Sequence, residues 1–140
     1  MATVPGGSET ILLVDSDPGT RKLAAFMLQK RGYTVLEARS TADAMLLYES
    51  AGAGADLLLT EILMPRMNGT ELARQLVALQ PQLRVLYMSH ADARRIARHV
   101  KIDSVRGFLQ KPFTMDRLTE KVRLALDSPR ERAGHGTTAS

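Results

Sequence analysis

The fold is decided by the stretch ILLVDSD at residues 11–17, in which four consecutive apolar residues are followed by polar ones. Such a short apolar run is typical of a β-strand that is buried on both faces. Similar runs are LLL at 57–59 and VLYM at 85–88, and weaker ones are YTVL at 33–36 and GFL at 107–109. The sequence therefore predicts five strands, of which the two weaker ones lie nearer the edges of a sheet.

Helical patterns separate the predicted strands, because apolar residues recur there with the i, i+3, i+4 spacing of one helix face. A stop at Gly32, a capping box from Ser40 to Asp43 and an N-cap at Thr114 mark helix ends. The weakest helical pattern is in residues 92–100. The positions expected to face the core are Leu23, Phe26, Met27, Ala44, Leu47, Tyr48, Leu72, Leu76, Leu79, Met115, Leu118, Val122 and Ala125. Strands that alternate with helices predict an α/β protein, with a doubly wound parallel sheet covered on both faces.

The chain has 140 residues, 44% of them hydrophobic and 24% charged, which is the size and composition of one globular domain. We expect residues 1–8 to form a flexible arm, residues 9–127 the domain and residues 128–140 a disordered tail. The absence of cysteine excludes a disulfide scaffold, thiolate zinc sites and thiol catalysis. Because no secretion signal and no run of roughly 20 apolar residues is found, we expect a cytoplasmic protein.

The formal net charge of +4 is concentrated in one segment. Residues 90–111 contain six lysines and arginines against two aspartates, so the rest of the chain is neutral. Aromatic residues make up only 4% of the chain, which argues against a surface on which nucleic-acid bases stack. The basic residues considered as a partner surface are Arg94, Arg95, Arg98, Lys101 and Arg106. They fit an acidic protein partner at least as well as DNA, and the plain alternative is a solvated helix surface.

Polar residues that could carry chemistry follow four of the predicted strands. In open α/β sheets, sites form at the carboxyl ends of the strands, which meet at one edge. The residues at these ends are Asp15, Ser16 and Asp17, then Thr60 and Glu61, then Ser89 and His90, and finally Lys111 and Pro112. Each alone can be polar simply because a strand end reaches water. The agreement of four strand ends nevertheless predicts a site of carboxylates, a hydroxyl group and one lysine.

Four motifs in this order carry a resemblance to a known family. They are ILLVDSDP at 11–18, DLLLTEILMPRMNG at 56–69, VLYMS at 85–89 and FLQKPF at 108–113. The chain over residues 9–127 resembles a response-regulator receiver domain, in particular the receivers at the C-terminal end of hybrid histidine kinases. The resemblance implies a flavodoxin-like (βα)5 fold with the strand order 2-1-3-4-5 and a role in two-component or phosphorelay signalling.

The resemblance also implies a chemistry for the strand ends. Receivers accept a phosphoryl group from a phosphohistidine on an aspartate after the third strand, with the help of a divalent cation, usually Mg²⁺. By resemblance, Lys111 and Ser89 contact the phosphoryl oxygens, and the backbone carbonyl of Leu63 is a ligand of the metal ion. Ser89 is expected to switch conformation together with Phe108, and the peptide bond between Lys111 and Pro112 is expected to be cis.

Three positions depart from the family pattern. Glu61 stands where the acceptor aspartate is expected, and His90 replaces a small residue at the pocket entrance. The longer side chain of Glu61 displaces its carboxylate by about 1.5 Å, and a shift of about 1 Å can cost on the order of 10²-fold in rate. Ser16 replaces the second acid of the pair that begins with Asp15, while Asp17 is peripheral to the metal in the family. We therefore expect weak Mg²⁺ binding and no tightly bound cofactor.

These departures favour a degenerate receiver, or pseudo-receiver, that does not cycle through phosphorylation. A Glu61 carboxylate that reaches towards Lys111 and Ser89 would occupy roughly the place of the phosphoryl group and imitate the activated state. Such a domain is a regulatory binding module and not an enzyme. Its expected partners are a histidine kinase, a phosphotransfer protein or a neighbouring kinase domain, and we expect a monomer or a weak dimer without membrane contact.

Three alternatives stay open at the level of the sequence. The first is a receiver that is still phosphorylated at a low, Mg²⁺-dependent rate on Glu61. The second is DNA binding through the basic residues of the segment 90–111, which a salt-dependent gel shift would reveal. The third is a transition-metal site with two carboxylates and one histidine, formed by Asp15, Glu61 and His90.

Overall fold

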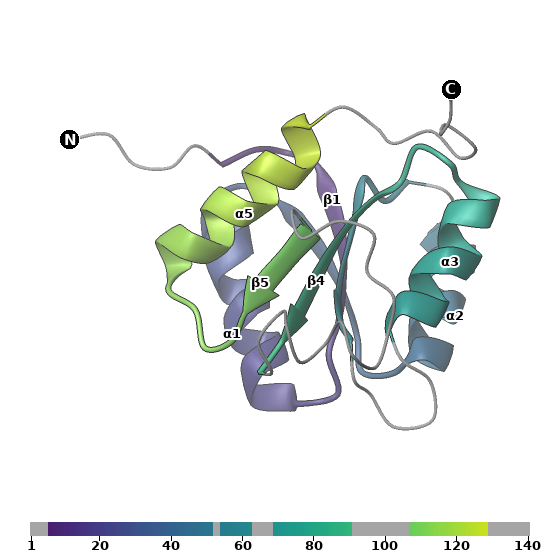
Figure 1. Cartoon of the computed structure of the whole chain (residues 1–140), viewed down its shortest axis with the longest axis horizontal. Helices are drawn as coiled ribbons and strands as arrows, with labels where there is room; N and C mark the ends of the chain where they lie inside the picture. The colour runs from purple at the N-terminus through teal and green to yellow at the C-terminus, as the bar shows by residue number, and fades with distance from the viewer. Residues whose placement is uncertain (1–5, 52–53, 63–68, 91–106, 129–140) are drawn as a thin grey trace.

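The computed structural model describes residues 6–51, 54–62, 69–90 and 107–128. These residues form one parallel β-sheet with helices on both of its faces (Figure 1). The strands are β1 (Thr10–Val14), β2 (Thr34–Ala38), β3 (Leu57–Glu61), β4 (Arg84–Ser89) and β5 (Phe108–Gln110). The helices are α1 (Pro18–Lys30), α2 (Thr41–Ala51), α3 (Gly69–Leu79) and α5 (Met115–Asp127). The helix expected in residues 92–100 lies outside the described residues.

All strand pairs are parallel and the strand order is β2-β1-β3-β4-β5, which confirms the predicted fold class and order. Strand β1 lies in the interior of the sheet, and β2 is the outer strand beside it. The strands β3, β4 and β5 follow in order on the other side of β1. In the pairing of β1 with β3, Leu12 lies opposite Leu58. Because the strands are parallel, all their carboxyl ends lie at one edge, which we call the carboxyl edge, opposite the amino edge. In folds of this kind, ligands bind at the carboxyl edge where the strand order reverses.

The core consists of two layers of apolar side chains, one on each face of the sheet. One layer is covered by α1 and α5 and the other by α2 and α3, which Figure 1 shows on opposite sides of the strands. Successive residues of β1 point to opposite faces, so Ile11 and Leu13 belong to the first layer and Leu12 and Val14 to the second. This burial on both faces is the physical reason for the continuous apolar runs in the sequence.

Helix α1 turns a different face to the sheet from the one that its large apolar residues predicted. Leu23 and Phe26 are 51% and 55% exposed, whereas Ala24, Ala25 and Leu28 are buried. Two small alanine side chains allow the helix to lie close against the sheet, and interiors are packed so densely that bulkier side chains would hold it away. The prediction that Leu23 and Phe26 face the core was therefore wrong.

The other helices bury most of the residues that the spacing predicted. Leu72 and Leu76 of α3 and Leu118 and Val122 of α5 are fully buried, but Leu79, the last residue of α3, is 62% exposed, which corrects that prediction. Also buried or packed against the core, as predicted, are Met27, Ala44, Leu47, Tyr48 and Ala125. None of the helices in the described part of the chain has the length and apolar character needed to cross a membrane.

Side chains cap the helices at two of the predicted positions. The Thr114 hydroxyl oxygen accepts a hydrogen bond from the backbone N–H of Arg117 at 3.1 Å, at the start of α5. The Ser40 hydroxyl oxygen accepts one from the N–H of Asp43 at 3.0 Å, at the start of α2. These hydrogen bonds satisfy N–H groups that have no partner inside the first turn of a helix.

The end of α1 holds the last residues of the expected N-terminal arm. The backbone N–H of Gly7 donates to the carbonyl of Arg31 at 3.1 Å. Gly32, at the predicted helix stop, has a φ of 101°, and a Cβ atom there would lie 2.4 Å from the carbonyl oxygen of Gly7. Glycine is required at this turn both for the backbone conformation and for the close approach.

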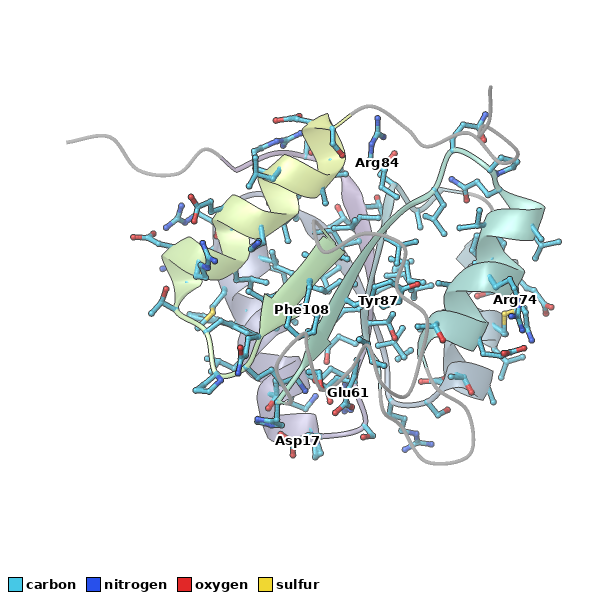
Figure 2. All side chains as sticks on the ribbon, in the orientation of Figure 1. Asp17, Glu61, Arg74, Arg84, Tyr87 and Phe108 are labelled. Atoms are coloured by element: carbon cyan, nitrogen blue, oxygen red, sulfur yellow. The ribbon has the colours of Figure 1, made fainter. Side chains whose placement is uncertain are left out.

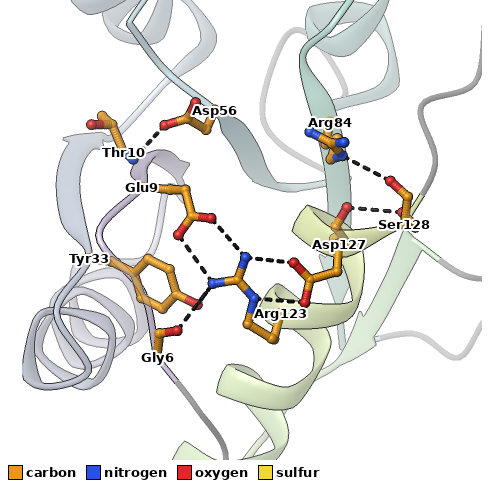
Figure 3. Close-up of polar contacts among 10 residues, drawn as sticks. Gly6, Glu9, Thr10, Tyr33, Asp56, Arg84, Arg123, Asp127 and Ser128 are labelled. Atoms are coloured by element: carbon orange, nitrogen blue, oxygen red, sulfur yellow. Dashed lines mark hydrogen bonds and ion pairs between the residues drawn. The ribbon is translucent and has the colours of Figure 1, made fainter.

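Arg123 links separate elements at the amino edge (Figure 3). Its Nη2 atom is 2.7 Å from the Glu9 Oε2 atom and 2.8 Å from the Asp127 Oδ1 atom. Its Nη1 atom donates to the Tyr33 hydroxyl group at 3.2 Å and to the Gly6 carbonyl at 3.1 Å. The hydrogen bonds from Arg123 lower the pKa of both Glu9 and Asp127. We call Arg123 with these two carboxylates the arginine clasp.

Candidate functional site

Four strands bring residues of the predicted site together at the carboxyl edge. Asp15 follows β1, Glu61 ends β3, Ser89 ends β4 and Lys111 follows β5. Three of them are buried, with exposed fractions of 0% for Asp15 and 3% each for Ser89 and Lys111. The side chain of Glu61 is 14% exposed and can be reached from solvent, and Figure 2 shows it at this end of the sheet. These residues lie together because parallel strands all end at the same edge of the sheet.

Lys111 is the central charge of the site. Its Nζ atom is 2.6 Å from the Oδ2 atom of Asp15 and 3.4 Å from the Oε2 atom of Glu61. The backbone N–H of Lys111 donates to the carbonyl of Ser89 at 2.9 Å, which ties the ends of β4 and β5 together. The peptide bond between Lys111 and Pro112 is cis, as the resemblance implied. We call Lys111 with the carboxylates of Asp15 and Glu61 the lysine cluster.

The carboxylate of Glu61 is held from two sides. The Ser16 hydroxyl group donates to its Oε1 atom at 3.2 Å, while Lys111 contacts its Oε2 atom. Burial raises the pKa of Glu61, and the negative charge of Asp15 raises it further, whereas Lys111 acts in the opposite direction. Because the pKa is raised overall, the attraction of Lys111 does not fully offset the effect of burial together with the repulsion by Asp15.

Asp17 serves the helix and not the site. Its Oδ2 atom accepts hydrogen bonds from the backbone N–H of Thr20 at 3.0 Å and from the Thr20 hydroxyl group at 2.6 Å, which caps the start of α1. These hydrogen bonds lower the pKa of Asp17. Its backbone N–H donates to the Oδ1 atom of Asp15 at 2.9 Å. Of the three residues predicted for an acidic pocket, Asp15 and Ser16 therefore face Glu61 or Lys111, and the Asp17 carboxylate is turned to the helix.

Two residues that the sequence analysis did not assign to the site support it. The Arg21 Nη1 atom donates to the carbonyl of Asp15 at 3.0 Å, and its Nε atom contacts the Oε1 atom of Glu37 at 3.3 Å. A Cβ atom at Gly69 would lie 2.2 Å from the carbonyl oxygen of Glu61, so only glycine fits where α3 begins. The available signals were the position of Arg21 in the first turn of α1 and the place of Gly69 at the end of a family motif.

The two residues expected to switch together lie on neighbouring strands. Phe108 is the first residue of β5, is 8% exposed and lies opposite Tyr87 of β4, as Figure 2 shows. Ser89, at the end of the same strand β4, is buried. His90 follows it and is exposed, at the rim of the site. The structure describes one inward-packed position of Phe108, and its coupled movement with Ser89 stays a prediction.

Part of the predicted site lies outside the described residues. This holds for the metal-ligand candidate Leu63 and for the basic residues Arg94, Arg95, Arg98, Lys101 and Arg106. Among the residues that the structure does describe, no group of three or more histidine, cysteine, aspartate or glutamate side chains is placed to hold a metal ion. The alternative of a transition-metal site at Asp15, Glu61 and His90 therefore gains no support.

The described side chains at this edge do not fit a Mg²⁺ ion. Such an ion is held through carboxylate oxygens that are free to coordinate it. The Oδ2 atom of Asp15 contacts the Lys111 ammonium, and its Oδ1 atom accepts from the N–H of Asp17. Ser16 offers a neutral hydroxyl group in place of a second acid, and this group already donates to Glu61. The donor set is thus poorer than the one that the family resemblance implies.

Comparison with known proteins identifies the family. The sequence matches the response regulator receiver domain over residues 11–123, so the chain belongs to this family and is a receiver module of a two-component system. It is 35% identical to the sensor kinase CckA of Brucella abortus over 126 residues, which cover 90% of this chain and 13% of that protein. It is 32% identical to the C4-dicarboxylate transport transcriptional regulatory protein DctD of Rhizobium meliloti, over 86% of this chain and 26% of that protein. The chain thus spans only a small part of these relatives.

Solved structures show the same fold. The receiver domain of the hybrid histidine kinase CckA is 28% identical, with a TM-score of 0.69 over 84% of this chain and 99% of that one. A response regulator receiver protein from Sinorhizobium medicae is 29% identical, with a TM-score of 0.74 over 86% of this chain and 96% of that one. These similarities confirm the predicted receiver fold and the likeness to the receiver of a hybrid kinase.

Proposed function

We propose that this receiver acts as a fixed binding module, in which Glu61 takes the place of the phosphoacceptor and does not enter a phosphorylation cycle. The observation that carries the proposal is the contact of the Glu61 carboxylate with both Ser16 and Lys111. An anionic group already lies against the lysine that, by family resemblance, contacts the phosphoryl oxygens. The domain would therefore present its signalling state without a phosphoryl group.

Three features support a low reactivity of Glu61 as a phosphoryl acceptor. Its carboxylate sits one methylene further from the backbone than that of an aspartate, and the optimal attack geometry tolerates little displacement. Both of its oxygen atoms are in contact with donors, Ser16 on one side and Lys111 on the other. The described donor set around Asp15 is poor for the divalent cation that offsets charge repulsion between a carboxylate and a phosphoryl group.

The partner that we propose is a histidine kinase, a phosphotransfer protein or a kinase domain next to this one. The similarity to a sensor kinase and to a hybrid-kinase receiver supports a partner from two-component signalling. The domain would regulate that partner by binding to it, and we propose no enzymatic activity of its own. Charge reversal of Arg94 and Arg95 tests whether the basic segment contributes, because it would weaken binding to an acidic surface.

A second candidate is a receiver that is phosphorylated slowly on Glu61 with the help of Mg²⁺. The observation in its favour is that the Glu61 side chain is 14% exposed and faces Lys111, so a donor can reach it. Both candidates predict the same fold and the same family of partners. They differ in a covalent product, which a direct measurement detects.

The test is incubation of the chain with acetyl phosphate and Mg²⁺, followed by intact mass spectrometry. We expect an unchanged mass, and unchanged NMR spectra on addition of beryllofluoride, which mimics the phosphoryl group. The matched control is the double variant Ser16→Asp with Glu61→Asp, which restores the two acids of the family pattern and should gain a labile phosphoryl group. Stoichiometric incorporation into the unmodified chain that disappears in Glu61→Gln would overturn the proposal in favour of the second candidate.

A further inference from the structure

We infer that Lys111 is the resident cation of this site: its ammonium group is the counter-charge of the carboxylates, in place of a divalent metal ion. The inference rests on the proposed function, in which Glu61 is not a phosphoryl acceptor that needs a metal ion. It makes two statements about ion binding. The intact chain excludes divalent cations from the carboxyl edge, and removal of the Lys111 charge opens a cation site at Asp15 and Glu61.

The first step is the contact between Lys111 and Asp15. The Nζ and Oδ2 atoms are 2.6 Å apart, and the two side chains are 1% and 0% exposed. A carboxylate buried to this extent requires a counter-charge, which Lys111 supplies by direct contact. A metal ion on the same carboxylate would have to share its charge with the ammonium group, so it would be held only where further negative charge is available beside Asp15.

The second step is the charge of the lysine cluster. Asp15 and Glu61 contribute two negative charges and Lys111 one positive charge, so the cluster carries a net charge of −1, and Ser16 adds none. An acid at position 16 would leave two negative charges uncompensated, which a divalent ion beside the lysine would neutralise. Ser16 removes that excess, and the remaining charge is too small to favour a doubly charged ion over its hydration shell.

The third step is that Lys111 and the backbone of Asp15 are both held in place. The Lys111 side chain is 1% exposed, and its backbone is tied to Ser89 at the end of β4. Arg21, which is paired with Glu37, fixes the backbone of Asp15, with its Nη1 atom 3.0 Å from the Asp15 carbonyl oxygen and its side chain 12% exposed. Lys111 is therefore held at the Asp15 carboxylate, and Arg21 holds the backbone of the same residue.

The experiment uses Mn²⁺, which prefers oxygen ligands as Mg²⁺ does and whose free form is counted by electron paramagnetic resonance. The full chain is compared with Lys111→Met and with the matched control Lys22→Met, which removes the same charge from a side chain that is 71% exposed. We expect Mn²⁺ to stay free in the presence of the unmodified chain and of Lys22→Met. Lys111→Met should bind Mn²⁺ at least about tenfold more tightly than either.

A thermal measurement gives a second readout and protects the test against a folding defect. Mn²⁺ should raise the Tm of Lys111→Met and leave the Tm of the unmodified chain unchanged, because a ligand that binds only the native state stabilises it. If Lys111→Met does not fold, Lys111→Gln takes its place, since its amide can still donate to Asp15. Lys111→Gln should then also bind Mn²⁺ at least about tenfold more tightly than the unmodified chain and Lys22→Met.

Two outcomes would overturn the inference: Mn²⁺ binding by the unmodified chain as tight as that of the Lys111 variants, or folded Lys111 variants that bind no more tightly than Lys22→Met. These outcomes are separate from a failure of the proposed function. A chain that binds Mn²⁺ but takes up no phosphoryl group refutes the resident cation alone. A chain that excludes Mn²⁺ and is nevertheless phosphorylated on Glu61 refutes the proposed function.

Discussion

The arginine clasp and the lysine cluster, at opposite edges of the sheet, have the same number of charges in two different arrangements. At the amino edge, Arg123 lies between Glu9 and Asp127, as Figure 3 shows, and at the carboxyl edge Lys111 lies between the two carboxylates of the site. In both places one cation joins two acids from different segments. The arginine clasp lowers the pKa of both of its acids and so favours their charged form. In the lysine cluster, by contrast, the pKa of Glu61 is raised.

The difference follows from the shape of the cation and from burial. The guanidinium group of Arg123 presents several N–H donors in a planar fork, and its side chain is 20% exposed, so the pKa of Glu9 and of Asp127 is lowered. The ammonium group of Lys111 is a single point charge in the interior, and the pKa of Glu61 stays raised beside it. The clasp lowers the pKa of both of its acids and so supports the fold, whereas a largely buried acid whose pKa stays raised is typical of a functional site.

The largest expected effect comes from breaking the lysine cluster. Lys111→Met leaves Asp15 buried without its counter-charge, which we expect to lower the free energy of unfolding by about 3–5 kcal/mol. Urea denaturation followed by circular dichroism measures this loss. The double variant Asp15→Asn with Lys111→Met removes both charges and should recover much of the stability. If Lys111→Met cost less than about 1 kcal/mol, the pair would not be the buried contact described above.

A smaller effect is expected from breaking the arginine clasp. Arg123→Met should lower the free energy of unfolding by roughly 1–2 kcal/mol at neutral pH, because charge-assisted hydrogen bonds are lost at a partly exposed position. The lowered pKa values of Glu9 and Asp127 mean that this stability is fully present above their ordinary values of 4.5 and 3.8 and is lost as the pH falls through the lowered ones. Urea titrations at several pH values measure this trend.

The control for the clasp is Arg117→Met, on the same helix. Arg117 is 57% exposed and contacts only the neighbouring Glu120 among its described ion pairs, at 3.2 Å, so its loss should cost no more than about 0.5 kcal/mol. The difference in the free energy of unfolding between Arg123→Met and the unmodified chain should become smaller in acid. The corresponding difference for Arg117→Met should change little with pH. If the difference for Arg123→Met became larger in acid, the assignment of the lowered pKa values to Arg123 would be contradicted.

The smallest expected effect, and the one of opposite sign, is that of Glu61→Gln. A raised pKa means that ionisation of Glu61 costs stability: the cost is absent below the ordinary value of 4.5, grows towards the raised value and is complete above it. Glu61→Gln should therefore stabilise the fold at neutral pH by less than about 1 kcal/mol and have no effect in acid. Thermal unfolding at both pH values is the measurement. A loss of stability at neutral pH would show that the contact with Lys111 outweighs burial.

The sheet could be predicted because a short stretch of sequence is enough to indicate each strand. The runs that became β1 and β3 are continuous and apolar, since both faces of these strands are covered, and the parallel order then brings their polar ends together. The orientation of α1 was not predictable in this way. Periodicity gives Leu23 and Phe26 the greatest weight, yet the close approach of the helix depends on two alanines whose burial becomes visible only once the helix is placed.

The roles of single polar residues were predictable only in part. Asp17 fits both an acidic pair and a helix cap, and the cap prevails because the N–H of Thr20 lies only three positions away. The arginine clasp carried no signal at all, because Glu9 and Arg123 are distant in the sequence and Arg123 lies in a charged helix that reads as solvated surface. Its contacts exist only in the assembled fold.

The pair of Lys111 and Asp15 joins two residues that are 96 positions apart in the chain. Contacts of such long range are costly in loop-closure entropy and form late, after local structure has assembled. Asp15, which follows β1, therefore lacks its counter-charge until β5 has been added beside β4. The completed pair is thus a feature of the finished sheet, and an intermediate that lacks β5 carries Asp15 without its counter-charge.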